Sequence, residues 1–222
     1  MNTKYPHIFE PIKVRNTYFS NRIIASPMGA NPNTTTINST NYGIMSGLDK
    51  AVGGAGALVV VLNGTGVDPK HTYEANGYDP FKNKYAMDVL RDQVSVLRRG
   101  GALLGYAAAM AQMNGGVHYS CSGKPFAGRP TQTMPEEIIL EEVENTARRA
   151  KEAIRFGFDF IQLDICCDNI VAQFIAPGFN TREDQWGGSL DNRLRLPLLL
   201  IDKVREAVGE DVAIVLRLSV NL

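Results

Sequence analysis

Residues 156–193 of the chain, FGFDFIQLDICCDNIVAQFIAPGFNTREDQWGGSLDNR, decide its fold class. The stretch opens at the end of a helix, where Gly157 can adopt the positive φ that stops a helix. A short apolar strand follows, over residues 158–163. Its carboxyl end carries polar and thiol groups, at Asp164, Cys166, Cys167 and Asp168. Residues just past the carboxyl ends of parallel strands line the ligand crevice of α/β proteins, so we expect the functional site here.

The same strand–helix alternation extends in both directions along the chain. Apolar, β-rich runs predict further strands at residues 22–28, 56–66, 102–110 and 212–219. Helical periodicity and stop signals predict helices at residues 42–51, 86–99, 136–156 and 190–208. Pro197 either kinks the last helix or marks its true start. Residues 8–19 predict a small β-hairpin before the main fold.

This order of elements is typical of a parallel α/β protein. The alternation by itself does not separate a closed barrel from an open, flavodoxin-like sheet. The polar loop NTREDQWGGS (residues 180–189) holds the single tryptophan, and we expect it to anchor the connection that enters the last helix.

Composition excludes several classes of protein. A length of 222 residues favours one domain, over residues 1–222. The 23 basic and 23 acidic residues balance, which argues against binding to nucleic acid or to an anionic membrane. The apolar runs ALVVVL and LPLLLI are far shorter than the roughly 18 residues of a membrane span. With no secretory signal and three cysteines that form no disulfide framework, we expect a cytoplasmic protein.

Two long blocks of sequence resemble a known family. Residues 174–193, FIAPGFNTREDQWGGSLDNR, and residues 7–29, HIFEPIKVRNTYFSNRIIASPMG, resemble the Old Yellow Enzyme family of FMN-dependent NAD(P)H:flavin oxidoreductases. The resemblance implies a (β/α)8 TIM barrel with an N-terminal hairpin, and about five of the eight strands lie in this chain. Such a piece exposes strand edges, so we expect a longer protein, a homo-oligomer or a partner that completes the barrel.

The resemblance also implies a set of flavin contacts, with NAD(P)H as the reductant. The corresponding positions are Pro27, Met28, Gly29, Gly64, Ala107 and Arg217. Arg217 matches the arginine near flavin N1, where positive charge stabilises the anionic reduced ring. Its alternative role is an ordinary salt bridge at the end of a strand. Ala107 stands where the family has a glutamine that hydrogen-bonds the flavin, and alanine cannot form that bond.

Substrate activation departs further from the family pattern. Members of the family use a His-x-x-His or His-x-x-Asn pair, with a tyrosine two positions later, to polarise and protonate the substrate. The matching catalytic positions are Asp164, Cys167 and Asn169. An ionised aspartate only accepts hydrogen bonds and a thiol donates weakly, so ordinary reduction of an activated double bond is disfavoured.

The leading hypothesis is an FMN-dependent oxidoreductase that passes hydride from NAD(P)H through flavin to an unsaturated or other small acceptor. The alternative is a catalytically impaired or truncated relative that binds or assembles with other molecules, or has no activity. A third hypothesis, an NAD-dependent dehydrogenase, is disfavoured because the sequence does not contain the glycine signature of that class. The Cys166–Cys167 pair invites a redox hypothesis, but it lacks C-x-x-C spacing, and packing is the commoner role. His118-x-x-Cys121 is too weak a pattern to predict a metal site.

Overall fold

Five parallel strands form the central sheet of the computed structural model. The structure describes residues 4–27, 47–60, 79–82, 84–114, 116–125, 128–167 and 169–219. The strands are β3 (Ile24–Ala25), β4 (Ala57–Val60), β5 (Leu103–Ala108), β9 (Phe160–Ile165) and β10 (Ala213–Leu218), and they lie in that order across the sheet. Every neighbouring pair is parallel.

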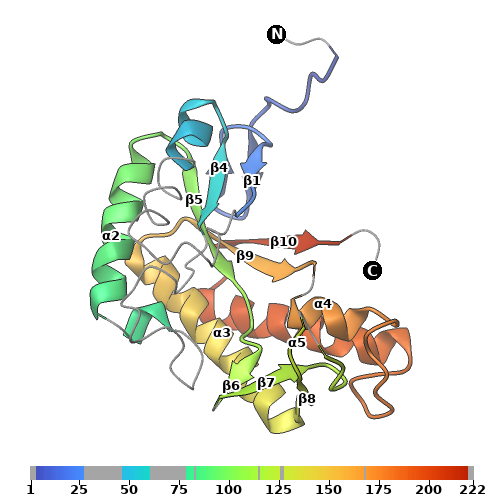
Figure 1. The fold of residues 1–222 in the computed structure, drawn as a ribbon. Helices are drawn as coiled ribbons and strands as arrows, with labels where there is room; N and C mark the ends of the chain where they lie inside the picture. The colour runs from blue at the N-terminus through green and yellow to red at the C-terminus, as the bar shows by residue number, and fades with distance from the viewer. Residues whose placement is uncertain are drawn as a thin grey trace.

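The order of the strands distinguishes a barrel from a doubly wound sheet. Each strand pairs with the strand that precedes it along the chain, so the order β3, β4, β5, β9, β10 runs in one direction across the sheet. In flavodoxin-like folds, by contrast, the strand order reverses at one point. The strand direction turns strongly from β4 to β10 (Figure 1). The sheet is therefore a curled half-barrel, and the flavodoxin-like alternative is excluded.

Three long helices cover one side of this sheet (Figure 1). They are α2 (Lys84–Arg98), α3 (Glu136–Phe156) and α5 (Leu190–Val208). Helix α3 follows Pro135 and ends at Gly157, whose φ of 115° and N–H bonds to Ala153 and Ile154 confirm the predicted stop. Helix α5 begins at Leu190, after the Ser189 cap, so Pro197 lies inside the helix rather than at its start.

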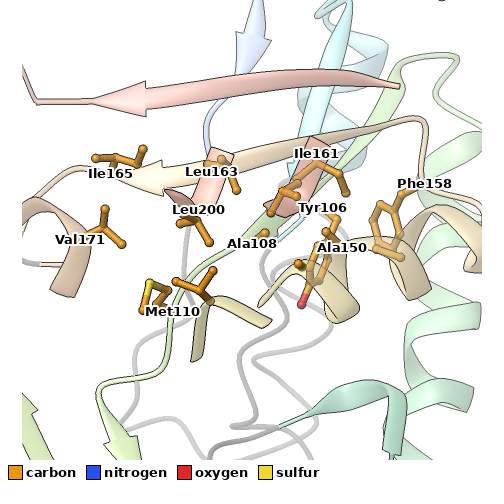
Figure 2. Close-up of a cluster of buried hydrophobic side chains, with 14 of the residues drawn as sticks. Tyr106, Ala108, Met110, Ala150, Phe158, Ile161, Leu163, Ile165, Val171 and Leu200 are labelled. Atoms are coloured by element: carbon orange, nitrogen blue, oxygen red, sulfur yellow. The ribbon is translucent and has the colours of Figure 1, made fainter. Parts of the chain in front are cut away.

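The hydrophobic core has two layers, one on each side of the sheet. Between sheet and helices, Ile161, Leu163 and Ile165 of β9 pack with Tyr106 and Ala108 of β5, as Figure 2 shows. Side chains on a strand alternate between its two faces, so the other face of β9 carries Phe160, Gln162 and Asp164.

We call the face of the sheet that lies away from the three long helices the inner face. An N-terminal hairpin covers this face at the amino ends of the strands. Strands β1 (Ile12–Val14) and β2 (Thr17–Phe19) pair antiparallel, which confirms the predicted hairpin. Phe19 meets Phe160 edge-on at 5.2 Å between ring centroids, and the Ala213 N–H donates to Thr17 Oγ1 at 3.3 Å. The polar carboxyl end of the inner face lies at the opposite end of the strands.

Two insertions depart from the sequence-based expectation of simple alternation. A small sheet, β6 (Met113–Asn114), β7 (Val117–Ser120) and β8 (Gln132–Thr133), lies between β5 and α3. A short helix, α4 (Ile170–Ile175), follows β9, because Asn169 Oδ1 accepts a hydrogen bond from the Val171 N–H and caps it. These elements are too short for periodicity to reveal them.

The remaining expectations are met in part. Residues 47–52 are helical, and the 3-10 turn η2 (Pro80–Lys82) precedes α2. The expected residues 28, 42–46 and 61–66 lie outside the described part of the chain. No helix among the described residues is long and apolar enough to cross a bilayer.

Candidate functional site

The strand register brings polar side chains together on the inner face of the half-barrel. Asp164 of β9 lies opposite Arg217 of β10, and Gln162 of β9 lies opposite Ala107 of β5. Partners in a parallel register point to the same side of the sheet. These four residues therefore share the face that carries Phe160, at the carboxyl end of the strands.

A carboxylate lies at the centre of this group. Asp164 Oδ1 accepts a hydrogen bond from Gln162 Nε2 at 3.0 Å and lies 3.6 Å from Arg217 Nη1. The Asp164 side chain is 17% exposed and that of Arg217 is 35% exposed. The guanidinium thus remains open to solvent on part of its surface while it pairs with Asp164. Both roles considered for Arg217, a salt bridge and a contact to an anionic ligand, are compatible with this geometry.

The two adjacent cysteines follow directly after β9. Cys166 is buried and Cys167 is exposed, and their Sγ atoms lie 3.6 Å apart. Burial raises the pKa of the Cys166 thiol to about 11; the Cys167 hydrogen bond and the Asp164 charge also raise this pKa, whereas Arg217 lowers it. Cys167 has a φ of 56°, and its N–H donates to Ser219 Oγ at 2.8 Å. Ser219 therefore ties the end of β9 to the end of β10.

The other sequence-predicted site residues lie in several places. Asn169 is the cap of α4, so its side-chain oxygen is already bonded to a backbone N–H. Pro27 is buried just beyond β3. Met28, Gly29 and Gly64 lie outside the described residues. The structure thus brings together Asp164, Cys167, Ala107 and Arg217 from the predicted set, and Met28, Gly29 and Gly64 remain predictions.

Sequence reasoning missed two residues of this site, Gln162 and Ser219. Gln162 is 4% exposed, lies opposite Ala107 in the strand register and donates a hydrogen bond to Asp164. The signal was the polar residue at every second position after Phe160, which places Gln162 and Asp164 on one face. Ser219 has no sequence signal, because its partner Cys167 is 52 residues away.

The carboxyl end of β5 is held by a buried ion pair on α3. Arg149 donates to the Ala109 carbonyl at 3.2 Å, and Glu142 Oε2 accepts from the Ala111 N–H at 3.2 Å. The two side chains lie 3.6 Å apart and are 8% and 3% exposed. The pair therefore fixes the backbone that follows Ala107.

Side-chain hydrogen bonds to backbone carbonyls hold the loop between α4 and α5. Asn180 Nδ2 donates to the carbonyls of Phe174 and Trp186 at 2.7 and 2.8 Å, and Trp186 is buried. Arg182 Nη1 reaches the carbonyls of Cys121 and Met134. The loop thus has the anchoring role expected from its sequence.

Comparison with known proteins assigns this arrangement to a family. The model of the NADH:flavin oxidoreductase / NADH oxidase family matches residues 99–221. A metal reductase of Desulforamulus reducens is 30% identical over 226 residues, which cover 96% of this chain and 32% of that protein. An NADPH dehydrogenase of Clostridium acetobutylicum is 26% identical over 221 residues, covering 96% of this chain and 63% of that protein.

A solved structure shares this fold. The Old Yellow Enzyme from Pichia sp. AKU4542 superposes with a TM-score of 0.70 at 23% identity, over 95% of this chain and 59% of that one. This likeness confirms the predicted TIM-barrel type with an N-terminal hairpin. The chain spans less than two thirds of the length of each of these three proteins. It belongs to the NADH:flavin oxidoreductase / NADH oxidase family, whose members are Old Yellow Enzyme-type, FMN-dependent oxidoreductases.

Proposed function

We propose that this chain forms part of an FMN-dependent oxidoreductase that takes hydride from NADH or NADPH and delivers it to a small acceptor. The observation that carries the proposal is the placement of Arg217. It lies on the inner face, at the carboxyl end of β10, with part of its guanidinium exposed. The family resemblance implies that the polar edge of the flavin lies against this arginine.

The partly exposed Arg217 guanidinium fits the charge of a reduced flavin. Arg217 would hold the electron-rich edge of the ring, and the residues after β3, beginning at Pro27, would support it from the first strand. Ala107 leaves room but forms no hydrogen bond, so binding rests more heavily on Arg217. When bound, FMN supplies the chemistry of hydride transfer between NAD(P)H and an acceptor.

The acceptor side of the site differs from that of the family. The Asp164 carboxylate accepts hydrogen bonds and cannot stabilise negative charge that develops on a substrate oxygen. Cys167 is exposed and offers only a weak S–H donor. We infer that an acceptor bound here does not place a developing oxyanion against Asp164, which disfavours activated enones as substrates.

A second candidate function is a binding or assembly protein derived from the family. The observation that favours it is that Ala107, Asp164 and Cys167 stand at three positions where the resemblance implies hydrogen-bond donors to flavin or substrate. In this case the protein folds as described but does not turn over NAD(P)H.

Titration with FMN distinguishes the two candidates. We expect the purified chain to quench FMN fluorescence, to turn yellow, and to bleach under anaerobic conditions when NADPH is added. Replacing a charged hydrogen-bond donor costs about 1.5–3 kcal/mol, so Arg217→Gln should weaken FMN binding about 10- to 100-fold.

The matched control is Arg15→Gln, which removes an exposed arginine of the hairpin that pairs with Glu210. This variant should bind FMN as the wild type does. A folded chain that neither quenches FMN nor bleaches would favour the second candidate. Equal affinity in the wild type and Arg217→Gln would remove Arg217 from the flavin site.

A further inference from the structure

Two thiols are held in contact at the carboxyl end of β9. Cys166 is 6% exposed, whereas its neighbour Cys167 is exposed, and the Sγ atoms lie 3.6 Å apart. The positive φ of Cys167, 56°, is uncommon for a residue other than glycine. The bond from the Cys167 N–H to Ser219 Oγ stabilises this turn. The backbone thus presents one thiol to solvent with a second directly behind it.

We propose that Cys166 and Cys167 form a thiol–disulfide exchange site for small aliphatic disulfides such as oxidised glutathione. This activity does not depend on flavin or on the proposed hydride transfer. Cys167 is the attacking thiol, because it is the one that a soluble disulfide can reach. Cys166 is the resolving thiol, because it lies behind Cys167 and within contact distance of its sulfur.

The exchange balances in two steps. The Cys167 thiolate attacks one sulfur of the small disulfide; that S–S bond breaks, a mixed disulfide forms on Cys167, and the first small thiolate leaves and takes up a proton. Cys166 then loses its proton and attacks Cys167 Sγ, and the second small thiol leaves. One small disulfide becomes two thiols, and the protein is oxidised by the loss of two hydrogens.

The product is expected to be easily reversed. The Cα atoms of adjacent residues lie about 3.8 Å apart, below the roughly 4.4–6.8 Å usual for disulfides. A bridge between neighbours is therefore strained, and strained disulfides are readily reduced by other thiols. A readily reduced bridge is typical of a site that exchanges with small thiols and not of a structural disulfide.

The second step should depend strongly on pH. Burial raises the pKa of Cys166 to about 11, and the charged or thiol groups that act on it are Cys167, Arg217 and Asp164. Below that pKa the thiolate fraction rises about tenfold for each pH unit. The mixed disulfide on Cys167 should therefore persist longer near neutral pH and resolve quickly in alkali.

Intact mass analysis after incubation with oxidised glutathione at alkaline pH tests the site. The wild type should lose two hydrogens without retaining an adduct, and dithiothreitol should restore it. Cys166→Ser should keep one glutathione on Cys167, and Cys166→Ala serves as a second variant if the buried hydroxyl impairs folding. Cys167→Ser should show neither product, and buried Cys121 is the internal control for reactive thiols.

Two results would overturn the proposal. One is a wild type that keeps its glutathione adduct as long as Cys166→Ser does, since Cys166 would then resolve nothing. The other is a Cys167→Ser variant that reacts as fast as the wild type, since the attacking thiol would then lie elsewhere.

Discussion

Asp164 decides what charge the inner face of the half-barrel presents to a ligand. Its carboxylate lies between the Gln162 amide and the Arg217 guanidinium. A guanidinium already paired with a carboxylate interacts less strongly with a second anion. In the proposed flavin site, the Asp164 carboxylate therefore reduces the positive charge that Arg217 offers to an anionic ligand.

Replacing Asp164 with asparagine tests this effect. Asp164→Asn keeps the size and an acceptor for Gln162 but removes the charge, so Arg217 becomes available to the flavin. Partly exposed ion pairs contribute about 0.2–1 kcal/mol, and we expect FMN to bind up to about fivefold more tightly in fluorescence titrations at low salt. Asp88→Asn, at an exposed pair on α2, is the control and should leave affinity unchanged. Weaker binding in Asp164→Asn would contradict this account of the charge.

Helix α3 positions the carboxyl end of β5 through a buried pair of charges. Glu142 and Arg149 contact the backbone at Ala111 and Ala109, and neither side chain reaches bulk solvent to a large extent. Removing one member of a buried pair leaves the other charged and without its partner, and this costs more than the pair contributes as a whole. The helix therefore depends on both residues being present together.

Arg149→Met should lower the free energy of unfolding by about 3–5 kcal/mol, measured by urea denaturation. The double variant Glu142→Gln/Arg149→Met should recover much of this loss, because no unpaired charge remains. Arg155→Met, at an exposed pair with Glu152 on the same helix, is the control and should cost at most about 1 kcal/mol. A single variant no more destabilised than this control would show that the pair contributes little.

At the scale of the whole molecule, the central curled sheet has β3 and β10 at the two ends of its strand order. On β10, the side chains that face away from the inner surface include Leu216 and Leu218, which are 39% and 57% exposed. An exposed apolar strand at the end of a sheet is a template for pairing with another chain. We therefore expect the 222-residue chain to self-associate as its concentration rises.

The double variant Leu216→Lys/Leu218→Lys should reduce this self-association, because charged side chains on an edge strand oppose edge-to-edge pairing. Sedimentation velocity over a range of concentrations would measure it. Leu140→Lys, at an exposed position on α3, is the control and should associate as the wild type does. A wild type that stays monomeric at all concentrations would refute the prediction.

Much of this architecture could be predicted from local patterns. The Gly157 stop, the start of α5 and the hairpin follow from residue types and periodicity within a few positions. Insertions were missed where the elements are short, as in α4 and in the sheet of β6, β7 and β8. Each of these elements spans at most six residues, so hydrophobic periodicity gives no signal for them.

The amino-acid sequence alone determined the parallel α/β class, the order of the elements and the resemblance to a flavin-dependent family. Only the tertiary structure decided that Arg217 pairs with Asp164, that Cys166 and Cys167 touch, and that Phe160 packs against Phe19 of the hairpin. Periodicity is a property of neighbours in the chain. Strand register and local backbone conformation set which side chains meet in space, and they are fixed by packing of the whole sheet.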